Sequence, residues 1–246
     1  MALNIPKNIW QTYELPFDQL EENIKESART WQDLNPDWKY NYMDAKQREE
    51  FVLSEFGQDW YDIFVSCPLG VMRADIWRYM IVYTYGGVYA DLDALCKAPI
   101  EDWWKDEYNL IVGPENNTHF LNWVFAGKPK NSVLKNVLDT IKENFKNPDY
   151  SDVHFVHRLT SPGAFTKGIK SLLEIPEETA LVDDYNEYMS LPKVIEHKFF
   201  CYGNEDKHIF QDQKVHHVYG SQNWNKGYVK WIDHTEEVVK VYKEKQ

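Results

Sequence analysis

The chain lacks long hydrophobic runs and any surplus of basic residues. Nowhere do about 18 apolar residues follow one another, and the first residues lack the basic start and apolar run of a signal peptide. With 27 basic against 39 acidic residues the net charge is −12, which disfavours nucleic acid and anionic membranes as partners. We therefore expect a soluble protein with no transmembrane segment.

Cysteine is also scarce. Cys67, Cys96 and Cys201 are odd in number and widely spaced, which fits buried thiols in a reducing compartment better than a disulfide framework or a zinc site. The cytoplasm is therefore the expected location. Internal repeats, low-complexity tracts and flexible linkers are absent from the 246 residues, so we expect a single domain over residues 1–246.

Aromatic residues, by contrast, are abundant. They make up 15% of the chain, with ten Trp and sixteen Tyr. Flat apolar faces with polar edges suit sugar rings and nucleobases. Filling of the core explains such residues equally well, and composition alone leaves both interpretations open.

Apolar spacing and turn residues predict alternating strands and helices. The clearest helix covers residues 70–85, ends at Gly86-Gly87, and carries Met72, Ile76 and Met80 along one stripe. Further helices are expected over residues 17–34, 44–57, 133–145 and after 233. Strands are expected over residues 7–13, 38–43, 88–91, 109–113, 120–127, 180–184 and 214–220. This alternation indicates an α/β sheet with helices packed on it.

Two aspartates follow the strand predicted to begin at residue 88. If residues 88–93 are extended, Tyr89, Asp91 and Asp93 share one face and Leu92 takes the other. Carboxylates spaced about 7 Å apart at the end of a strand can hold a hard divalent cation. Aspartate is also common where a strand turns, so a purely structural role stays open.

The preceding helix carries a second polar pair. Asp75 and Arg78 are three residues apart, lie on one helical face and are expected to point away from the apolar stripe. They form either a surface ion pair or a pair of ligand contacts, in which a carboxylate holds a hydroxyl and a guanidinium holds a phosphate or sugar oxygen.

Residues 73–93, RADIWRYMIVYTYGGVYADLD, resemble the signature of the DXD-containing glycosyltransferases of family 32, which include yeast-type initiating mannosyltransferases and bacterial capsule enzymes. IPKNIWQTY (5–13), LTSPGAFTKGI (159–169) and HHVYGSQNW (216–224) resemble further elements of that family in the same order. The resemblance implies a GT-A type, Rossmann-like fold with a mixed sheet flanked by helices. It also implies a UDP- or GDP-sugar donor, a glycan or other acceptor, and a bound Mn²⁺ or Mg²⁺.

The resemblance assigns roles to individual residues. Asp91, Asp93 and Arg78 match the catalytic positions, and Asp91 and Asp93 match the motif that meets the metal, with Asp93 favoured as the direct ligand. Counting back from Ser221 selects His216 over His217 as a further metal ligand. The residues that match donor-binding positions are Ile9, Trp10, Gln11, Asp75, Arg78, Tyr89, Asp91, Pro162, Gly163, Ser221 and Trp224. This chain departs from the family pattern with Trp10 in place of His, Ser161 in place of Gly, and Gln222-Asn223 inserted before Trp224.

Three functions are therefore weighed. The first is a retaining, metal-dependent glycosyltransferase of polysaccharide biosynthesis, in which the acceptor hydroxyl attacks on the face that the diphosphate leaves. The second is a haloacid-dehalogenase-like phosphohydrolase, with Lys167 and Asp183-Asp184 in supporting parts; Ala94 and Leu95 after the aspartates disfavour it. The third is a non-catalytic carbohydrate-binding protein.

Overall fold

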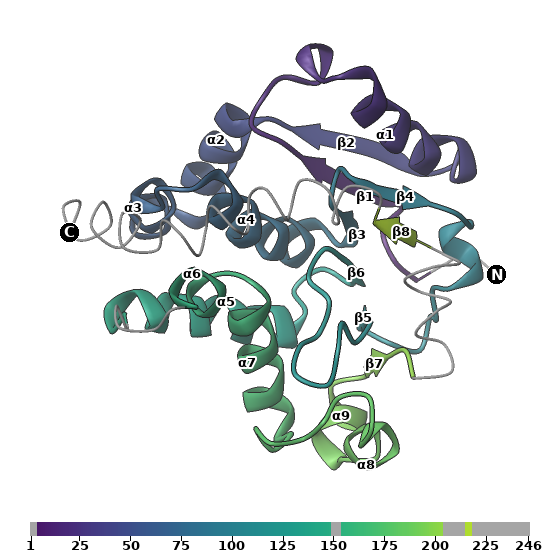
Figure 1. Ribbon diagram of the computed structural model, residues 1–246, viewed down its shortest axis with the longest axis vertical. Coiled ribbons are helices and arrows are strands. Elements are labelled where there is room, and N and C mark those ends of the chain that lie inside the picture. Colours follow the sequence, from purple (N-terminus) through teal and green to yellow (C-terminus); the bar gives the residue numbers. More distant parts are fainter. Residues whose placement is uncertain (1–3, 149–153, 204–214, 218–246) are drawn as a thin grey trace.

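A mixed sheet of six strands forms the centre of the molecule. The computed structural model describes residues 4–148, 154–203 and 215–217, and the strand order is β2-β1-β3-β6-β5-β7 (Figure 1). Its strands are β1 (Asn8–Thr12), β2 (Lys39–Met43), β3 (Gly87–Ala90), β5 (Leu110–Val112), β6 (Val124–Gly127) and β7 (Phe199–Cys201). β1 is parallel to β2 and β3, and β5 is parallel to β7, whereas β6 is antiparallel to β3 and β5. The mixed α/β sheet expected from the sequence is confirmed.

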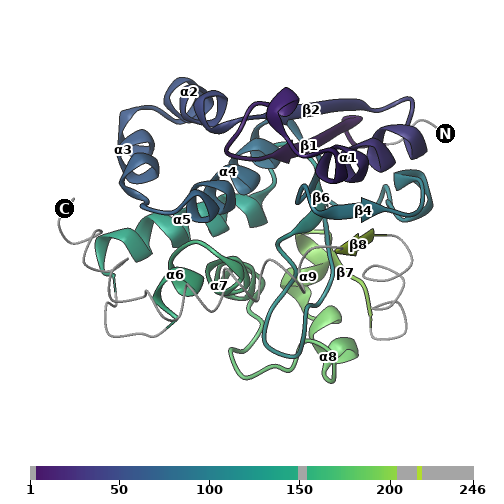
Figure 2. The same cartoon turned by 45° about the horizontal axis from the view of Figure 1, so that its top comes forward.

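A second, two-stranded sheet lies beside the first. It pairs β4 (Ala94–Cys96) antiparallel with β8 (Val215–His217), which brings a segment from late in the chain next to the residues that follow β3. Figure 2 shows β4 and β8 together, with α1 (Glu22–Leu34) alongside β4.

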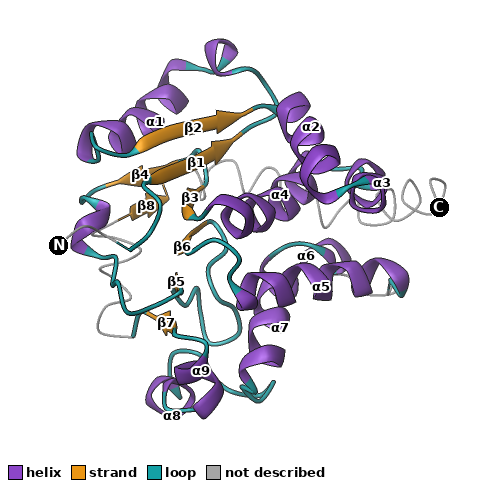
Figure 3. Cartoon of the chain, turned by 180° about the vertical axis from the view of Figure 1, so that it is seen from behind, coloured by secondary structure: helices purple, strands orange, loops and turns teal. Residues whose placement is uncertain are grey.

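Helices pack on both faces of the central sheet. α4 (Gly70–Tyr85) contacts β1, β3 and β6, and α5 (Ser132–Lys146) packs beside α4 and α7 (Pro162–Leu173). Figure 3 shows this arrangement from behind, with α4 next to β3 and α7 below α5. The remaining helices are α2 (Ala45–Phe56), α3 (Gln58–Ser66), α6 (Phe155–Leu159), α8 (Tyr185–Met189) and α9 (Pro192–Glu196), with short 3₁₀ turns η1 (Phe17–Gln19) and η2 (Ile100–Asp102).

Alternation along the strands divides the core into two layers. Trp10, Tyr89 and Phe125 are aligned across three neighbouring strands and belong to the cluster packed under α4. Their strand neighbours belong to the second cluster, on the side of α1: Ile9, Val88 and Ala126. The aromatic residues of the central strands therefore pack in the core.

The predicted helix over residues 70–85 is confirmed at both ends. Gly86 and Gly87 follow it with φ of +68° and +110°, and a Cβ on Gly87 would meet the Asn8 carbonyl oxygen at 2.3 Å. Glycine is therefore required for the tight passage from α4 into β3. The predicted cap of α2 is also confirmed, because Asp44 and Gln47 form a reciprocal capping box.

Other predictions differ from the structure. Residues 180–184 form turns in place of the predicted strand, because the Asp184 carboxylate accepts from the Ala180 amide at 2.8 Å and closes a local loop. Residues 162–173, which were not among the predicted helices, form α7 with Pro162 in its first turn. The helix expected after residue 233 lies outside the described residues. Cys67, Cys96 and Cys201 are free and buried, as expected. In the described part of the chain, the helices are all too short or too polar to cross a bilayer.

Candidate donor and metal site

The two aspartates occupy a turn between the two sheets. β3 ends at Ala90, and the Ala94 amide donates to the Asp91 carbonyl at 3.0 Å, so residues 91–93 are not extended. The prediction that Asp91 and Asp93 share a strand face is therefore wrong: the chain turns here to leave the central sheet and enter β4. Leu92 is buried with Leu20 and Ala28, in agreement with its predicted core position.

Backbone contacts fix this turn to the neighbouring strands. The Asp91 amide donates to the Trp123 carbonyl at 2.7 Å, and the Gln11 side chain donates to the Asp91 carbonyl at 3.0 Å. Gln11 itself accepts from the Tyr40 hydroxyl at 2.9 Å. Gln11 therefore holds the DXD turn from β1. The donor contact predicted for Gln11 stays a prediction.

Arg78 lies at the centre of a buried charge cluster. Its Nη2 is 3.1 Å from Oδ1 of Asp75 and 3.1 Å from Oδ1 of Asp91. Its Nη1 donates to the Asn122 carbonyl at 2.8 Å, and the guanidinium lies 4.7 Å from the centre of the Tyr89 ring. The Tyr89 hydroxyl also donates to Oδ1 of Asp91. Arg78 therefore joins the predicted α4 residues to the DXD turn.

Asp75 is held by groups from two other parts of the chain. Its Oδ2 accepts from the Ser161 hydroxyl and, at 3.4 Å, from Thr160, while its Oδ1 accepts from Asn122 at 3.2 Å. Asn122 also donates to the Tyr79 hydroxyl at 2.9 Å. Ser161 and Asn122 were not among the predicted site residues; the replacement of the family's usual Gly at position 161 was the available signal for the former.

Burial governs the electrostatics of the cluster. Asp75 and Arg78 are only 2% and 4% exposed, so neither forms the surface ion pair considered from the sequence. Burial raises the pKa of Asp75, although Arg78 and the surrounding hydroxyl and amide donors oppose the shift. Burial would lower the pKa of Arg78, but Asp91 and Asp75 outweigh it and raise that pKa. Arg78 is therefore a fixed positive charge.

The sequence predicted that the polar face of α4 points away from its apolar stripe. Met72, Ile76 and Met80 are buried, but so are Asp75 and Arg78, because the sheet and α5 enclose this helix on several sides. A helix covered all round pairs its charges internally. The helix thus delivers its charges to a protein-lined site.

The carboxylates of Asp91 and Asp93 fit a hard divalent cation. Both residues are partly exposed, and the Asp91 side chain is 18% exposed while Arg78 and Tyr89 contact its Oδ1. In the parts of the chain that the structure describes, no group of three or more His, Cys, Asp or Glu side chains is placed to hold a metal. Mg²⁺ is commonly held by one or two carboxylates together with substrate phosphates, so the pair is a suitable partial ligand set.

The other predicted residues are distributed around this turn. Trp10 is 6% exposed, donates to the Gly86 carbonyl at 2.9 Å and stacks on Tyr85, so its indole lies in the core and is not an open surface for a base. Ile9 and Tyr89 are also buried. Their predicted donor contacts stay predictions, and any such contact requires backbone atoms or a rearrangement.

The predicted closing element is only partly described. β8 places His216 opposite Leu95 and His217 opposite Ala94, the residue directly after Asp93. The register therefore brings the backbone of both histidines to the strand that follows the DXD turn, and the metal role of His216 stays a prediction. Ser221 and Trp224 lie outside the described residues.

Pro162 and Gly163 begin α7 next to Ser161. A Cβ on Gly163 would lie 2.7 Å from Nδ1 and 3.0 Å from the carbonyl oxygen of His157, so glycine permits close contact with α6. Both residues line a cavity between α5, α6 and α7. The start of α7 thus contacts the Asp75 cluster through Ser161 and the cavity through its next two residues.

Comparisons with known proteins agree with this geometry. A family model described as the glycosyltransferase sugar-binding region containing a DXD motif matches residues 21–110, which include α4 and the DXD turn. Over these residues the chain is similar to the DXD-containing glycosyltransferases. An initiation-specific alpha-1,6-mannosyltransferase of Schizosaccharomyces pombe is 28% identical over 197 residues, covering 69% of this chain and 49% of that protein. Its counterpart in Candida albicans is 30% identical over 164 residues, covering 56% of this chain and 43% of that protein.

Two further comparisons bear on the range of similar proteins and on the fold. The mannosyl phosphorylinositol ceramide synthase SUR1 of Saccharomyces cerevisiae is 38% identical over 98 residues, covering 39% of this chain and 25% of that protein. The solved structure of PaToxG glycosyltransferase matches with a TM-score of 0.52 at 20% identity, covering 68% of each chain, which supports the GT-A fold. The chain spans about half the length or less of these curated relatives.

Proposed function

We propose that the chain is a retaining glycosyltransferase that moves a sugar from a nucleotide-diphosphate donor to an acceptor hydroxyl. The observation that carries this proposal is the buried Asp75-Arg78-Asp91 cluster directly beside the DXD turn. The cluster holds Asp91 in one orientation, because Arg78, which contacts its Oδ1, is itself held by Asp75 and by the Asn122 carbonyl.

Asp91 and Asp93 would hold Mn²⁺ or Mg²⁺. When bound, the cation supplies positive charge that balances the diphosphate of the leaving group. Arg78 has a positioning role, since its guanidinium is engaged by Asp75, Asp91 and the Asn122 carbonyl. The register of β8 is the support for a contribution from His216.

Bond formation and bond breaking would occur on the same face of the sugar. The acceptor oxygen bonds to the anomeric carbon as the bond between that carbon and the diphosphate oxygen breaks. The electron pair of the broken bond passes to the diphosphate, which takes the acceptor proton. No protein nucleophile is needed, and the Asp91 contacts with Arg78 and Tyr89 disfavour its use as the nucleophile of a phosphohydrolase.

The names of the relatives suggest which donor to test first. Both initiation-specific enzymes are mannosyltransferases, and SUR1 also has a mannosyl-bearing product in its name. We therefore propose a mannosyl donor, with GDP-mannose tested beside UDP-sugars. The name of SUR1 also contains phosphorylinositol ceramide, a lipid, so glycan and lipid acceptors are both tested.

The proposal is tested by donor turnover with Mn²⁺ in the wild type and in Asp93→Asn. Asp33→Asn is the matched control, because Asp33 is exposed on α1. We expect Asp93→Asn to lose at least about 100-fold in kcat, as is usual when a key electrostatic group is removed, and the control to retain full activity. Equal turnover by both variants would contradict the assignment. Retention is checked by NMR of the anomer that forms first.

A further inference from the structure

A large cavity lies next to the charge cluster and has the opposite electrostatic character from the chain as a whole. Its volume is about 990 Å³, and its walls come from the loop between β5 and β6, the end of α5, α6, the first turns of α7 and the segment after α7. Six of its lining side chains are basic or imidazole groups: His119, His154, His157, Arg158, Lys167 and Lys170. Two are acidic, Glu115 and Glu177.

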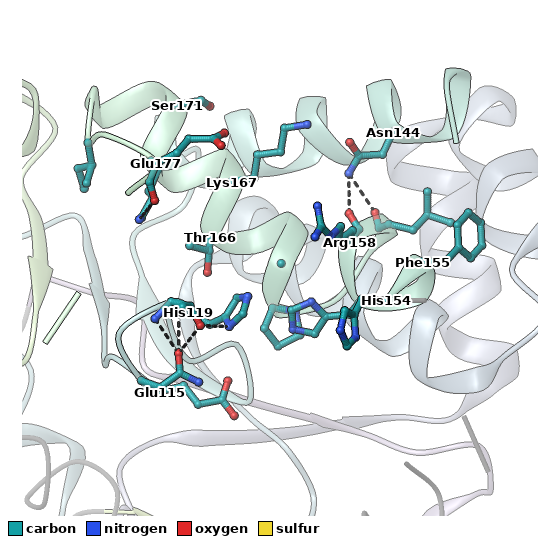
Figure 4. A pocket seen from close by; sticks show the side chains of 18 of the residues that line it. Glu115, His119, Asn144, His154, Phe155, Arg158, Thr166, Lys167, Ser171 and Glu177 are labelled. Carbon is teal, nitrogen blue, oxygen red and sulfur yellow. Dashed lines mark hydrogen bonds between the residues drawn. The ribbon is translucent and has the colours of Figure 1, made fainter. Parts of the chain in front are cut away.

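These basic groups converge on the cavity from separate elements. Figure 4 shows Arg158 of α6, Lys167 of α7 and His119 of the β5–β6 loop around one space. The His119 and His157 rings meet edge to face at 4.6 Å, and the close fit of His157 against Gly163 requires glycine at that position. On the count that gives the whole chain −12, with histidine neutral, the lining has the cations Arg158, Lys167 and Lys170 against Glu115 and Glu177, a small excess of basic groups.

Two fixed groups strengthen this positive potential. Lys170 is buried and donates to the carbonyl oxygens of Glu177 and Thr179 at 2.8 and 2.9 Å, so its ammonium is anchored in the wall. α7 has 12 residues and presents the amides of its first turn, around Gly163, on the same wall. The positive end of a helix macrodipole adds to the attraction for anions.

The positive groups around the cavity also act on His119. Burial lowers its pKa, and the positive charges of Lys170, Arg158 and His154 lower it further. The three histidines do not form a metal site, because no metal-holding group of three such side chains is found in the described residues.

We propose that this cavity binds a phosphate group carried by the acceptor substrate. This inference rests on the proposed function, since it places the acceptor beside the donor. Ser161 contacts Asp75 of the donor cluster, and the adjacent Pro162 and Gly163 line the cavity, so the two sites share one wall. A phosphate has several acceptor oxygens, which suits a site with guanidinium, ammonium, imidazole and amide donors. A phosphate also complements the excess of basic over acidic groups in the lining, which a neutral sugar does not.

The first test is calorimetric titration with inorganic phosphate, without nucleotide or metal. Wild type, Lys167→Glu and Lys46→Glu are compared; Lys46 is 85% exposed on α2 and supplies the same charge reversal away from the cavity. We expect phosphate affinity to fall about tenfold or more in Lys167→Glu and to be unchanged in Lys46→Glu. Equal affinities, or no saturable binding to the wild type, would overturn the proposal.

The second test distinguishes acceptor phosphate from donor diphosphate. GDP and UDP are titrated with Mn²⁺ present, and we expect Lys167→Glu to bind them as the wild type does. Phosphate should inhibit sugar transfer competitively with the acceptor while leaving hydrolysis of the donor unchanged. Competition between phosphate and the nucleotide would instead assign the cavity to the donor and overturn the proposal. Phosphate binding is measured independently of transfer, so loss of the proposed function alone does not affect the first test.

A third measurement covers a variant that fails to fold. The ring resonances of His119, identified by their loss in His119→Gln, are titrated with pH in the intact wild type. Bound phosphate should raise the pKa of His119, because a nearby negative charge favours the imidazolium. An unchanged titration curve in saturating phosphate would contradict the proposal.

Discussion

The charge cluster around Arg78 and the basic cavity beside it use charged residues in opposite ways. In the cluster, Arg78 pairs with both Asp75 and Asp91; Asp75 and Arg78 are nearly closed to solvent, and Asp91 is partly exposed. In the cavity, Arg158 and Lys167 are exposed around an open volume. The ion pairs of the cluster fix a geometry, whereas an excess of basic over acidic groups around an open volume attracts an anionic ligand. α7 connects the two, since Ser161 belongs to the cluster and Gly163 to the cavity wall.

Removal of Arg78, the residue at the centre of the cluster, should have the largest effect. Arg78→Ala leaves Asp75 and Asp91 without their shared cation, and removal of one partner of a buried ion pair costs about 3–5 kcal/mol. We expect a loss of that size in the free energy of unfolding, measured with urea, together with loss of donor turnover. Arg29→Ala is the control, because Arg29 is 52% exposed and pairs only with Glu22 on α1; its loss should be under about 1 kcal/mol. Similar losses for both variants would contradict the buried-cluster account.

A smaller change tests the link from α7. Ser161→Ala removes the hydroxyl that donates to Asp75, and a hydrogen bond to a charged group contributes about 1.5–3 kcal/mol. We expect a loss of stability in that range and a lower kcat, because Asp75 no longer holds Arg78 in one orientation. Ser54→Ala, whose hydroxyl donates only to Phe51 within α2, should change stability by less than about 0.5 kcal/mol. Unchanged stability and kcat in Ser161→Ala would separate α7 from the cluster.

The sequence predicted more of the chain's architecture than of its site. The spacing of apolar residues and the Gly86-Gly87 stop located α4 correctly, because both signals are local. The orientation of Asp75 and Arg78 depends on α5 and the sheet, which come from distant segments. A pattern along one helix shows which residues share a face but not what covers that face.

The DXD turn and the cavity show the same limit. Asp91 and Asp93 were singled out from the sequence, but the turn that they occupy is held by Gln11 of β1 and by the Trp123 carbonyl, which come from distant segments. The cavity was not predicted at all, because single basic residues such as His119 and Arg158 carry no signal until the fold brings them together. The family resemblance assigned donor binding to Pro162 and Gly163. It did not indicate that the neighbouring Ser161 contacts Asp75.

The thiol beneath the DXD turn gives the smallest expected effect. Cys96 of β4 is buried, and burial raises its pKa to about 11, although hydrogen bonds with Asn35 and Ala98 oppose the shift. At pH 8 only about one thiol in a thousand would be ionised, and reactivity should increase as the pH rises toward 11. Alkylation followed by mass spectrometry should show Cys96 reacting far more slowly than an exposed cysteine introduced as Ser54→Cys. Equal alkylation rates at pH 8 would show that Cys96 becomes exposed to solvent, contrary to its buried position.

Metal-dependent nucleotide binding tests the central claim most directly. GDP and UDP are titrated calorimetrically into wild type, Asp93→Asn and the exposed control Asp33→Asn, with Mn²⁺ and then with excess chelator. We predict that at least one nucleotide binds the wild type and the control only when Mn²⁺ is present. Asp93→Asn should lose this binding while unfolding in urea as the wild type does. Binding of equal affinity in Asp93→Asn, or binding that survives the chelator, would contradict a donor site built on the DXD turn.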